Sequence, residues 1–282
     1  MGSMQLQLHP KLLPPSSTFR PKSIRSSNDR QALFSRIAPV YDNLNDLLSL
    51  GQHRIWKRMA VSWTGAKMGD RVLDVCCGSG DLAFLLSEKV GSDGKVIGLD
   101  FSKQQLLIAS SRQHSKNHFR NIEWIEGDAL NLPFDDGWFD AITMGYGLRN
   151  VIDKHKAMQE IKRVLKAGST VSILDFNKSN DSLTSSMTFY RTGAPAPSII
   201  YAWHCLGLEQ NLQPTNEWMI DNVVVPVASG YGLSEEYRYL KSSIREFLTG
   251  KELEKLALEV GFSTARHYEI SGGLMGCLVA KR

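Results

Sequence analysis

Short apolar runs alternate with amphipathic stretches through the middle of the chain. Such runs are typical of buried parallel strands, and the stretches between them have the apolar spacing of helices. The expected strands are residues 71–77, 95–100, 122–128, 138–147 and 170–176, and the expected helices are residues 81–90, 102–115 and 153–165. Strands that alternate with helices form a parallel sheet with right-handed crossovers. The pattern therefore predicts a doubly wound α/β fold.

The C-terminal part of the chain predicts a helix followed by a hairpin. Thr249 and Glu252 form a capping-box pattern before an apolar periodic stretch, and Gly261 is placed to end the helix. Residues 265–270 and 275–282 flank the sequence Ser-Gly-Gly, which suits a tight turn. We therefore expect an antiparallel hairpin to close the sheet.

The N-terminal part of the chain divides into a basic leader and a helical cover. Residues 1–28 are rich in serine, proline and basic residues and contain no acidic residue, a composition typical of organelle transit peptides. Serine and proline favour a chloroplast over a mitochondrion, and an ordinary tail is the alternative. Residues 29–66 have near-helical apolar spacing interrupted by Pro39, which predicts two or three short helices. Residues 29–282 are then expected to form one domain.

The net charge of +4 resides in the leader. Lys11, Arg20, Lys22 and Arg25 belong to residues 1–28, so 33 − 4 leaves 29 basic against 29 acidic residues. This balance argues against a nucleic-acid partner, because nucleic-acid binding needs positive charge on the folded domain. No uninterrupted run of apolar residues is long enough for a spanning helix, so we expect any membrane contact to be peripheral.

The four cysteines give no sign of a metal site or a disulfide framework. Cys76, Cys77, Cys205 and Cys277 lack the C-x-x-C spacing, and adjacent Cys76 and Cys77 would point to opposite faces of a continuing strand. They suit small core residues in a reducing compartment. Residues 179–233 show no clear periodicity, and no chemistry is assigned to them. No metal ion is expected.

Polar residues at successive predicted strand ends point to a nucleoside ligand. Asp74 ends the first strand, and Gly78 and Gly80 form the turn into a helix, where glycine allows positive φ and close approach of a ligand. Asp100 ends the second strand, where a carboxylate can accept two ribose hydroxyls. Asp128 follows the third strand and is placed to accept a hydrogen bond from an adenine amino group. Together these residues predict an adenosine-type cofactor.

The identity of that cofactor depends on charge. The turn also satisfies the GxGxxA pattern of dinucleotide-binding proteins, so an NAD-dependent dehydrogenase is a rival interpretation. Asp74 and Asp81 place negative charge at the turn, which would repel a pyrophosphate but suit the amino group and sulfonium of S-adenosyl-L-methionine. Each carboxylate taken alone could instead hold a turn or cap a helix. The combination favours S-adenosyl-L-methionine, with S-adenosyl-L-homocysteine as product.

Several segments resemble the ubiquinone and menaquinone biosynthesis C-methyltransferases, which are class I S-adenosylmethionine-dependent enzymes with a Rossmann-like fold. The similarity covers about residues 29–175 and 217–282. The segments that carry it are YDNLNDLLSLGQHRIWKR, VLDVCCGSGDLA, GLDFS, GDALNLPF, FDAITMGYGLRNVIDKHKAMQEIKRVLKAG and SILDF. Residues 191–216 have no counterpart in the family pattern and are interpreted as an atypical insertion where elements that cover the substrate usually follow the fifth strand.

The resemblance also implies which residues bind the cofactor. Gly145 stands where some relatives have a hydroxyl near the cofactor, so a contact there is less direct. Besides Asp74, Gly78 and Gly80, the implied binding residues are Ser79, Asp100, Phe101, Asp128 and Ala129.

The resemblance is strongest to the plant branch and implies C-methylation of a prenylated naphthoquinol, the final ring methylation of vitamin K1 synthesis. Arg149 would stabilise the quinolate, and Asn150 would orient a hydroxyl or a water. Tyr41 and His53 are candidates for shaping the site or moving a proton. An ion pair with Asp153 or Asp42 is the structural alternative for Arg149, and a packed helix residue is the alternative for His53.

Two other functions remain compatible with these patterns. A mitochondrial C-methyltransferase of ubiquinone synthesis would use the same chemistry on a polyprenyl-benzoquinol. A methyltransferase-fold protein that binds the cofactor without turnover is the non-enzymatic possibility, raised by the segment 191–216. The sequence leaves the oligomeric state open.

Overall fold

A single seven-stranded sheet organises the computed structural model, which describes residues 51–115, 119–178, 234–271 and 273–282. The strand order is β3-β2-β1-β4-β5-β7-β6, with β1 to β5 parallel and β7 antiparallel to both β5 and β6. The strands are β1 Arg71–Val75, β2 Lys95–Asp100, β3 Ile122–Glu126, β4 Phe139–Gly145, β5 Leu165–Phe176, β6 Thr264–Ile270 and β7 Met275–Lys281. The predicted parallel sheet and closing hairpin are confirmed.

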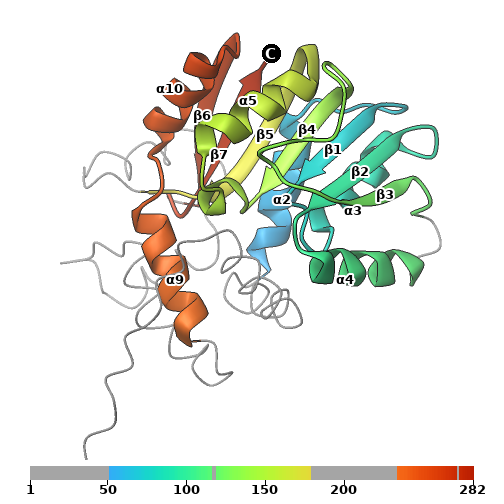
Figure 1. Cartoon of the computed structure of the whole chain (residues 1–282), viewed down its shortest axis with the longest axis horizontal. Coiled ribbons are helices and arrows are strands. Elements are labelled where there is room, and N and C mark those ends of the chain that lie inside the picture. Colours follow the sequence, from blue (N-terminus) through green and yellow to red (C-terminus); the bar gives the residue numbers. More distant parts are fainter. Residues whose placement is uncertain (1–50, 116–118, 179–233, 272) are drawn as a thin grey trace, which may run out of the picture.

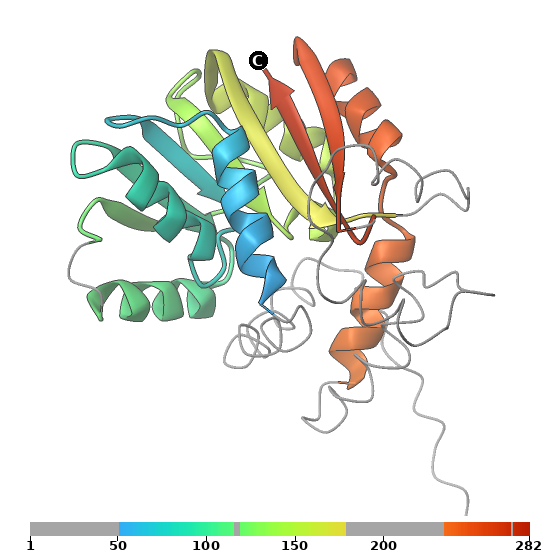
Figure 2. The same ribbon diagram turned by 180° about the vertical axis from the view of Figure 1, so that it is seen from behind.

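Helices cover both faces of this sheet. Helices α5 and α10 lie on one face, and α2 and α3 lie on the other (Figures 1 and 2). Helix α9 contacts η1 and extends beyond the edge where the parallel strands end (Figure 1). The elements are α2 Gln52–Trp63, α3 Asp81–Val90, α4 Lys103–His114, the 3-10 turn η1 Leu148–Asn150, α5 Lys154–Val164, α9 Ser234–Arg245 and α10 Gly250–Val260.

Side-chain caps fix where several helices begin. Ser102 accepts a hydrogen bond from the amide of Gln105 at the start of α4, and Asp153 caps α5. The capping box of Thr249 and Glu252 is present at the start of α10. Gly261 ends that helix with φ of 97°, which also confirms the prediction.

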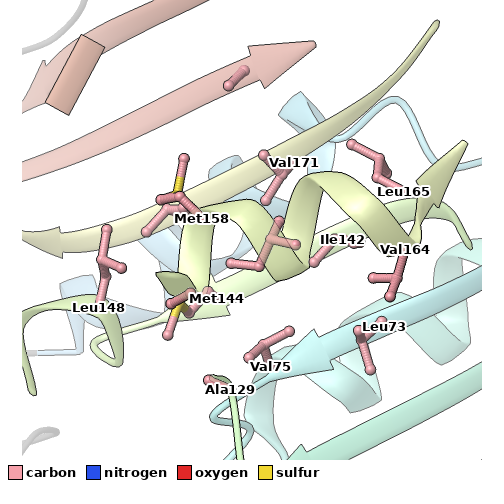
Figure 3. Packing of buried hydrophobic residues seen from close by; sticks show 14 of the residues in the cluster. Leu73, Val75, Ala129, Ile142, Met144, Leu148, Met158, Val164, Leu165 and Val171 are labelled. Atoms are coloured by element: carbon pink, nitrogen blue, oxygen red, sulfur yellow. The ribbon is translucent and has the colours of Figure 1, made fainter. Parts of the chain in front are cut away.

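The largest core lies between the sheet and the helices α5 and α10. Side chains of α5, among them Met158 and Val164, point toward Ile142 and Met144 of the central strand β4 (Figure 3). All four side chains are fully buried. Burying a side chain of this size contributes about 1.5–3 kcal/mol. The core therefore gives the ends of β1 and β4 a rigid base.

Three predicted strands end two residues earlier than expected, at Val75, Glu126 and Gly145 instead of residues 77, 128 and 147. The first strand ends at Val75, and Cys76 takes a φ of 55°, so the chain turns before the two cysteines instead of continuing through them. Residues 166–169, which connect the expected helix 153–165 with the expected strand 170–176, lie inside β5, where the pairing with β4 shifts between the pairs Phe139–Leu165 and Ala141–Thr170. A local bulge thus replaces a separate turn.

Several predictions concern residues outside the described ranges. These are the leader 1–28, most of the helical cover 29–66, the segment 191–216, and the single residues Tyr41 and Cys205. Helix α2 is the described part of the cover. Within the ranges given above, no helix has the length and apolar character needed to cross a membrane.

Candidate active site

A pocket opens at the carboxyl ends of β1, β2 and β4. This is the edge of the sheet where the strand order reverses between β1 and β4, and open α/β sheets bind ligands at such a point. Its lining residues are Lys57, Asp74, Cys76, Cys77, Gly78, Ser79, Asp81, Leu82, Leu99, Asp100, Phe101, Gln105, Gly127, Asp128, Ala129, Leu130, Gly145, Tyr146, Gly147, Asn150, Val151 and Ile152.

Most of the residues predicted to bind the cofactor meet in this pocket. Gly80 is the exception, because it lies in the turn but does not line the space. Among the predicted catalytic residues, Asn150 lines the pocket, whereas Arg149 and His53 do not. The predicted cofactor-binding residues thus gather at the pocket, whereas Asn150 is the one described catalytic candidate that borders it.

The two glycines of the turn have different tasks. Gly78 has φ of 54° and donates a 2.8 Å hydrogen bond from its amide to Oδ2 of Asp100. Gly80 has φ of 91°, and a Cβ there would lie 2.5 Å from the ring of Trp124. Gly80 therefore permits close packing of the turn against β3, while Gly78 joins the turn to the end of β2.

Asp100 holds two backbone segments with one carboxylate. Its Oδ2 accepts from the amide of Gly78 and its Oδ1 accepts from the amide of Ser102, both at 2.8 Å. Burial raises the pKa of Asp100, although these hydrogen bonds oppose the rise. A carboxylate has about four acceptor positions, so Asp100 can also accept a hydroxyl group from a ligand in the pocket.

Asp74 carries a buried oxygen without a hydrogen-bond partner among the described side chains and backbone groups. Oδ1 accepts a 2.8 Å hydrogen bond from the hydroxyl of Thr143, but Oδ2 has no partner, although the side chain is fully buried. Burial raises the pKa of Asp74 to about 7, against the lowering effect of Thr143. A buried acceptor at the pocket wall suits a positively charged ligand group.

Two cations share the carboxylate of Asp81 beside the turn. Nζ of Lys57 lies 2.5 Å from Oδ2, and Nη2 of Arg112 lies 2.6 Å from Oδ1. Burial alone would raise the pKa of Asp81, but the charges of Lys57 and Arg112 lower it to about 2. Arg112 also donates to the carbonyl and the hydroxyl of Ser79 at 2.9 Å. The cluster carries two positive charges against one negative charge.

No local sequence pattern marks Lys57 or Arg112 as residues of the site. Lys57 lies on α2 and is 24 residues from Asp81, while Arg112 lies on α4 and is 31 residues away. A basic residue on an amphipathic helix is ordinarily a solvated surface residue. Only the packing of α2 and α4 around the start of α3 brings the three groups together.

Arg149 is buried in an ion pair with Asp175. Its Nη1 contacts Oδ1 of Asp175, its own amide donates to Oδ2 at 3.1 Å, and its Nε donates to Ser243 of α9 at 2.9 Å. The proposed pair with Asp153 is wrong, because that carboxylate caps α5. Asp42 lies outside the described residues.

The side chain of Asn150 connects the pocket with α9. Its Nδ2 donates to the carbonyl oxygen of Tyr146 at 2.9 Å, and its Oδ1 accepts from the hydroxyl of Tyr239 at 3.0 Å.

His53 is 6% exposed on α2 and lies away from the pocket wall, in agreement with the packed-helix interpretation.

The cysteines of the turn line the pocket and are not simply core residues. Cys77 is buried, Cys76 is partly exposed, and the amide of Cys77 donates to the carbonyl of Leu99 at 3.0 Å. Burial raises the pKa of both thiols well above its ordinary value, which keeps them protonated and weakly nucleophilic. Among the residues that the structure describes, no cluster of three potential metal ligands occurs.

Comparisons with known proteins agree with this geometry. The model of the ubiE/COQ5 methyltransferase family matches residues 23–193 and 217–281. A solved structure of a SAM-dependent methyltransferase from Aquifex aeolicus superimposes with a TM-score of 0.55 at 19% identity, covering 85% of this chain and 96% of that one. At this identity the similarity concerns the fold.

Two named relatives are similar over nearly their whole length. The chain is 64% identical over 261 residues to the chloroplastic 2-phytyl-1,4-naphthoquinone methyltransferase of Arabidopsis thaliana, covering 92% of this chain and 89% of the relative. It is 46% identical over 256 residues to the 2-phytyl-1,4-naphthoquinone methyltransferase of Trichormus variabilis, covering 91% and 100%.

Proposed function

Because the chain belongs to the ubiE/COQ5 methyltransferase family, we propose that it methylates a ring carbon of 2-phytyl-1,4-naphthoquinol with S-adenosyl-L-methionine as donor. This reaction converts demethylphylloquinol to phylloquinol, or reduced vitamin K1. The observation that carries the proposal is the 64% identity to the Arabidopsis enzyme over 92% of the chain. That relative is chloroplastic by name, and the basic leader 1–28 fits the same location.

The pocket suits this cofactor on chemical grounds. The unpartnered Oδ2 of Asp74 supplies the acceptor that an amino group needs, and its carboxylate offsets positive charge. Asp100 would accept the ribose hydroxyls, and Asp128 with Ala129 would border the adenine. Ser79, Phe101 and Gly145 would complete the contact surface; these roles are part of the proposal.

S-adenosyl-L-methionine supplies an electrophilic methyl group on a sulfonium. The sulfur–methyl bond would break as a carbon–carbon bond forms at the unsubstituted ring position, and the ring carbon would give up its proton to water. The chain must favour ionisation of one quinol hydroxyl, because the oxyanion delivers electron density to that carbon. A positive group at the pocket wall lowers the free energy of the anion and of the transition state.

Lys57 is better placed than Arg149 for this electrostatic role. It lines the pocket, and it shares the single charge of Asp81 with Arg112. The charge of Arg149 is offset by Asp175 at a contact that excludes water. We therefore assign Arg149 to positioning η1 and α9, and Lys57 to stabilising the quinolate. Asn150 holds Tyr146, and His53 is assigned to packing on α2. A role for Tyr41 in shaping the site stays a prediction.

Methyl transfer to two alternative acceptors, measured separately, tests the function. The purified protein is incubated with methyl-labelled S-adenosyl-L-methionine and either 2-phytyl-1,4-naphthoquinol or a polyprenyl-benzoquinol. We expect label in the naphthoquinol, and none when the quinone is left oxidised. Label only in the benzoquinol would replace the proposed substrate with that of ubiquinone synthesis. Cofactor binding without methyl transfer to either acceptor would instead identify the chain as a protein that binds the cofactor without turnover.

A further inference from the structure

Tyr146 holds a backbone conformation that costs free energy for any residue with a side chain. Its φ is 58°, in the left-handed region that favours glycine. It follows the last residue of β4 and lines the pocket. Strained residues persist only where the surroundings fix them, and they gather at functional sites.

Both backbone polar groups of Tyr146 are fixed by hydrogen bonds. Its amide donates to the carbonyl of Leu174 on β5 at 2.7 Å. Its carbonyl accepts from Nδ2 of Asn150 at 2.9 Å, and Asn150 is in turn held by Tyr239. Three elements, β5, η1 and α9, therefore impose this conformation.

The residues on either side of Tyr146 are packed too closely to carry side chains. A Cβ on Gly145 would lie 2.6 Å from Cδ1 of Leu82, and one on Gly147 would lie 2.7 Å from Cβ of Cys76. A glycine at position 146 would satisfy the same backbone without strain. The chain nevertheless carries an aromatic side chain there, so the ring itself must serve a purpose.

The ring lies in surroundings suited to a flat aromatic ligand. The Phe176 ring centre is 5.8 Å away at an interplanar angle of 54°, and Nζ of Lys57 is 5.8 Å from the Tyr146 ring centre. The ring packs against the cluster of α2 with the hairpin but is only partly buried. It thus stands between a fixed apolar support and the pocket, close to the cation proposed to stabilise the quinolate.

We propose that Tyr146 is the wall against which the aromatic ring of the methyl acceptor packs, and that it determines specificity for an aromatic acceptor. The proposal rests on the proposed function for the identity of that acceptor. Aromatic rings attract one another through offset or edge-to-face contacts beyond their buried area. The strained conformation is what directs the ring from the end of β4 to this position.

Three substitutions in the full chain separate the ring from its backbone. Tyr146→Phe keeps the ring, Tyr146→Leu keeps apolar bulk without a ring, and Tyr146→Gly removes both side chain and strain. We expect Tyr146→Phe to keep the KM for the naphthoquinol within about twofold. Tyr146→Leu and Tyr146→Gly should raise it about tenfold, a loss that corresponds to one or two aromatic contacts. Affinity for S-adenosyl-L-homocysteine, measured by calorimetry, should change less than about twofold in all three.

Ser271→Gly is the matched control. Ser271 has a φ of 54° in the turn before β7 and does not line the pocket, so this variant relieves a similar strain elsewhere. It also removes the hydroxyl that accepts a 2.8 Å hydrogen bond from Nε1 of Trp56. Its acceptor KM should equal that of the wild type. A wild-type KM in Tyr146→Leu would overturn the proposal, as would a proportional loss of S-adenosyl-L-homocysteine affinity in Tyr146→Gly.

A turnover-independent measurement separates this inference from the proposed function. Binding of 1,4-naphthoquinol to the S-adenosyl-L-homocysteine complex is followed by quenching of intrinsic fluorescence. Tyr146→Leu should weaken this binding about tenfold. If the wild type binds the naphthoquinol but never methylates it, the proposed reaction fails. The role of Tyr146 is then decided by whether Tyr146→Leu binds the naphthoquinol more weakly than the wild type. If the wild type methylates the phytyl substrate but Tyr146→Leu binds the naphthoquinol as tightly as the wild type, the role of Tyr146 alone fails.

Discussion

Arg149 and Asp175 form an ion pair from which water is almost completely excluded, with each side chain 4% exposed. The pair joins the 3-10 turn after β4 to the end of β5 and is completed by the amide of Arg149. A buried pair of this kind contributes little net free energy while intact, but it is costly to break by removing one partner. Arg149 is thus tied to the fold before any substrate arrives.

Arg149→Ala should lower the free energy of unfolding by about 3–5 kcal/mol, because it leaves the Asp175 carboxylate buried and unpaired. Urea denaturation of the apoprotein measures this loss. Lys166→Ala is the control, since it breaks a partly exposed pair with Asp140 and should cost only about 0–1 kcal/mol. An Arg149→Ala protein as stable as the wild type, yet without turnover, would return Arg149 to direct stabilisation of the quinolate.

Asp74 should make cofactor affinity depend on pH near neutrality. Its pKa of about 7 in the free protein means that the carboxyl is largely protonated below that pH. A cationic ligand favours the carboxylate, so S-adenosyl-L-homocysteine, through its amino group, should bind more tightly as pH rises from about 6 to 8. In Asp74→Asn, titration calorimetry across this range should find weaker binding without that rise. An equal pH dependence in the variant would assign it to another group.

The same carboxyl should destabilise the apoprotein as the pH rises. Because the folded pKa lies above the ordinary value of 3.8, the folded state binds more protons than the unfolded state between pH 3.8 and about 7. The contribution of Asp74 to the unfolding free energy therefore falls across this window and is constant above it. The difference in melting temperature between Asp74→Asn and the wild type should grow from pH 5 to pH 7. A constant difference would contradict the raised pKa.

Gly80→Ala should damage the turn far more than Gly69→Ala. Both glycines have positive φ, 91° and 84°, so an alanine is strained at either position. A Cβ at Gly80 meets the Trp124 ring at 2.5 Å, whereas one at Gly69 meets nothing within 4 Å. Gly69→Ala should cost about 1–2 kcal/mol, and Gly80→Ala should cost at least about 1 kcal/mol more through overpacking. Thermal unfolding measures the stability of both variants, and tryptophan fluorescence reports on the surroundings of Trp124. Equal losses of stability in the two variants would refute the steric argument.

Lys57→Gln should reduce turnover by more than about tenfold while Arg112 continues to hold Asp81, because one cation at the pocket wall is lost. It should also move the pH–rate profile to higher pH, since the bound quinol ionises less readily without Lys57. Arg112→Gln is the comparison: it loses the bonds to Ser79 and should weaken cofactor binding without that pH shift. A shift of the pH–rate profile in Arg112→Gln but not in Lys57→Gln would assign stabilisation of the quinolate to Arg112 instead of Lys57.

Local sequence patterns sufficed for the sheet and for one side of the site. Asp74 and Asp100 follow apolar runs directly, so their place at the strand ends could be predicted from their neighbours. Asp175 could not be predicted as the partner of Arg149, because it is 26 residues away and becomes adjacent only when β5 pairs with β4. The sequence offered Asp153, which is nearer along the chain but is committed to a helix cap.

The conformation of Tyr146 was also beyond the sequence pattern. Its neighbours Gly145 and Gly147 predict a break after the strand, but either glycine could have taken the left-handed conformation. The choice is made by Leu174 and Asn150, which fix the amide and the carbonyl. Such constraints depend on tertiary contacts.

The side-chain amide of Asn150 has one orientation that satisfies both of its partners. Its nitrogen donates to the carbonyl oxygen of Tyr146 and its oxygen accepts from the hydroxyl of Tyr239. Rotating the amide by 180° would place its oxygen against the Tyr146 carbonyl oxygen, which cannot donate. An aspartate of the same size keeps the acceptor but loses the donor, and a leucine loses both. Position 150 therefore requires a side chain with two unlike ends, and its identity is set by the two tyrosines that it joins.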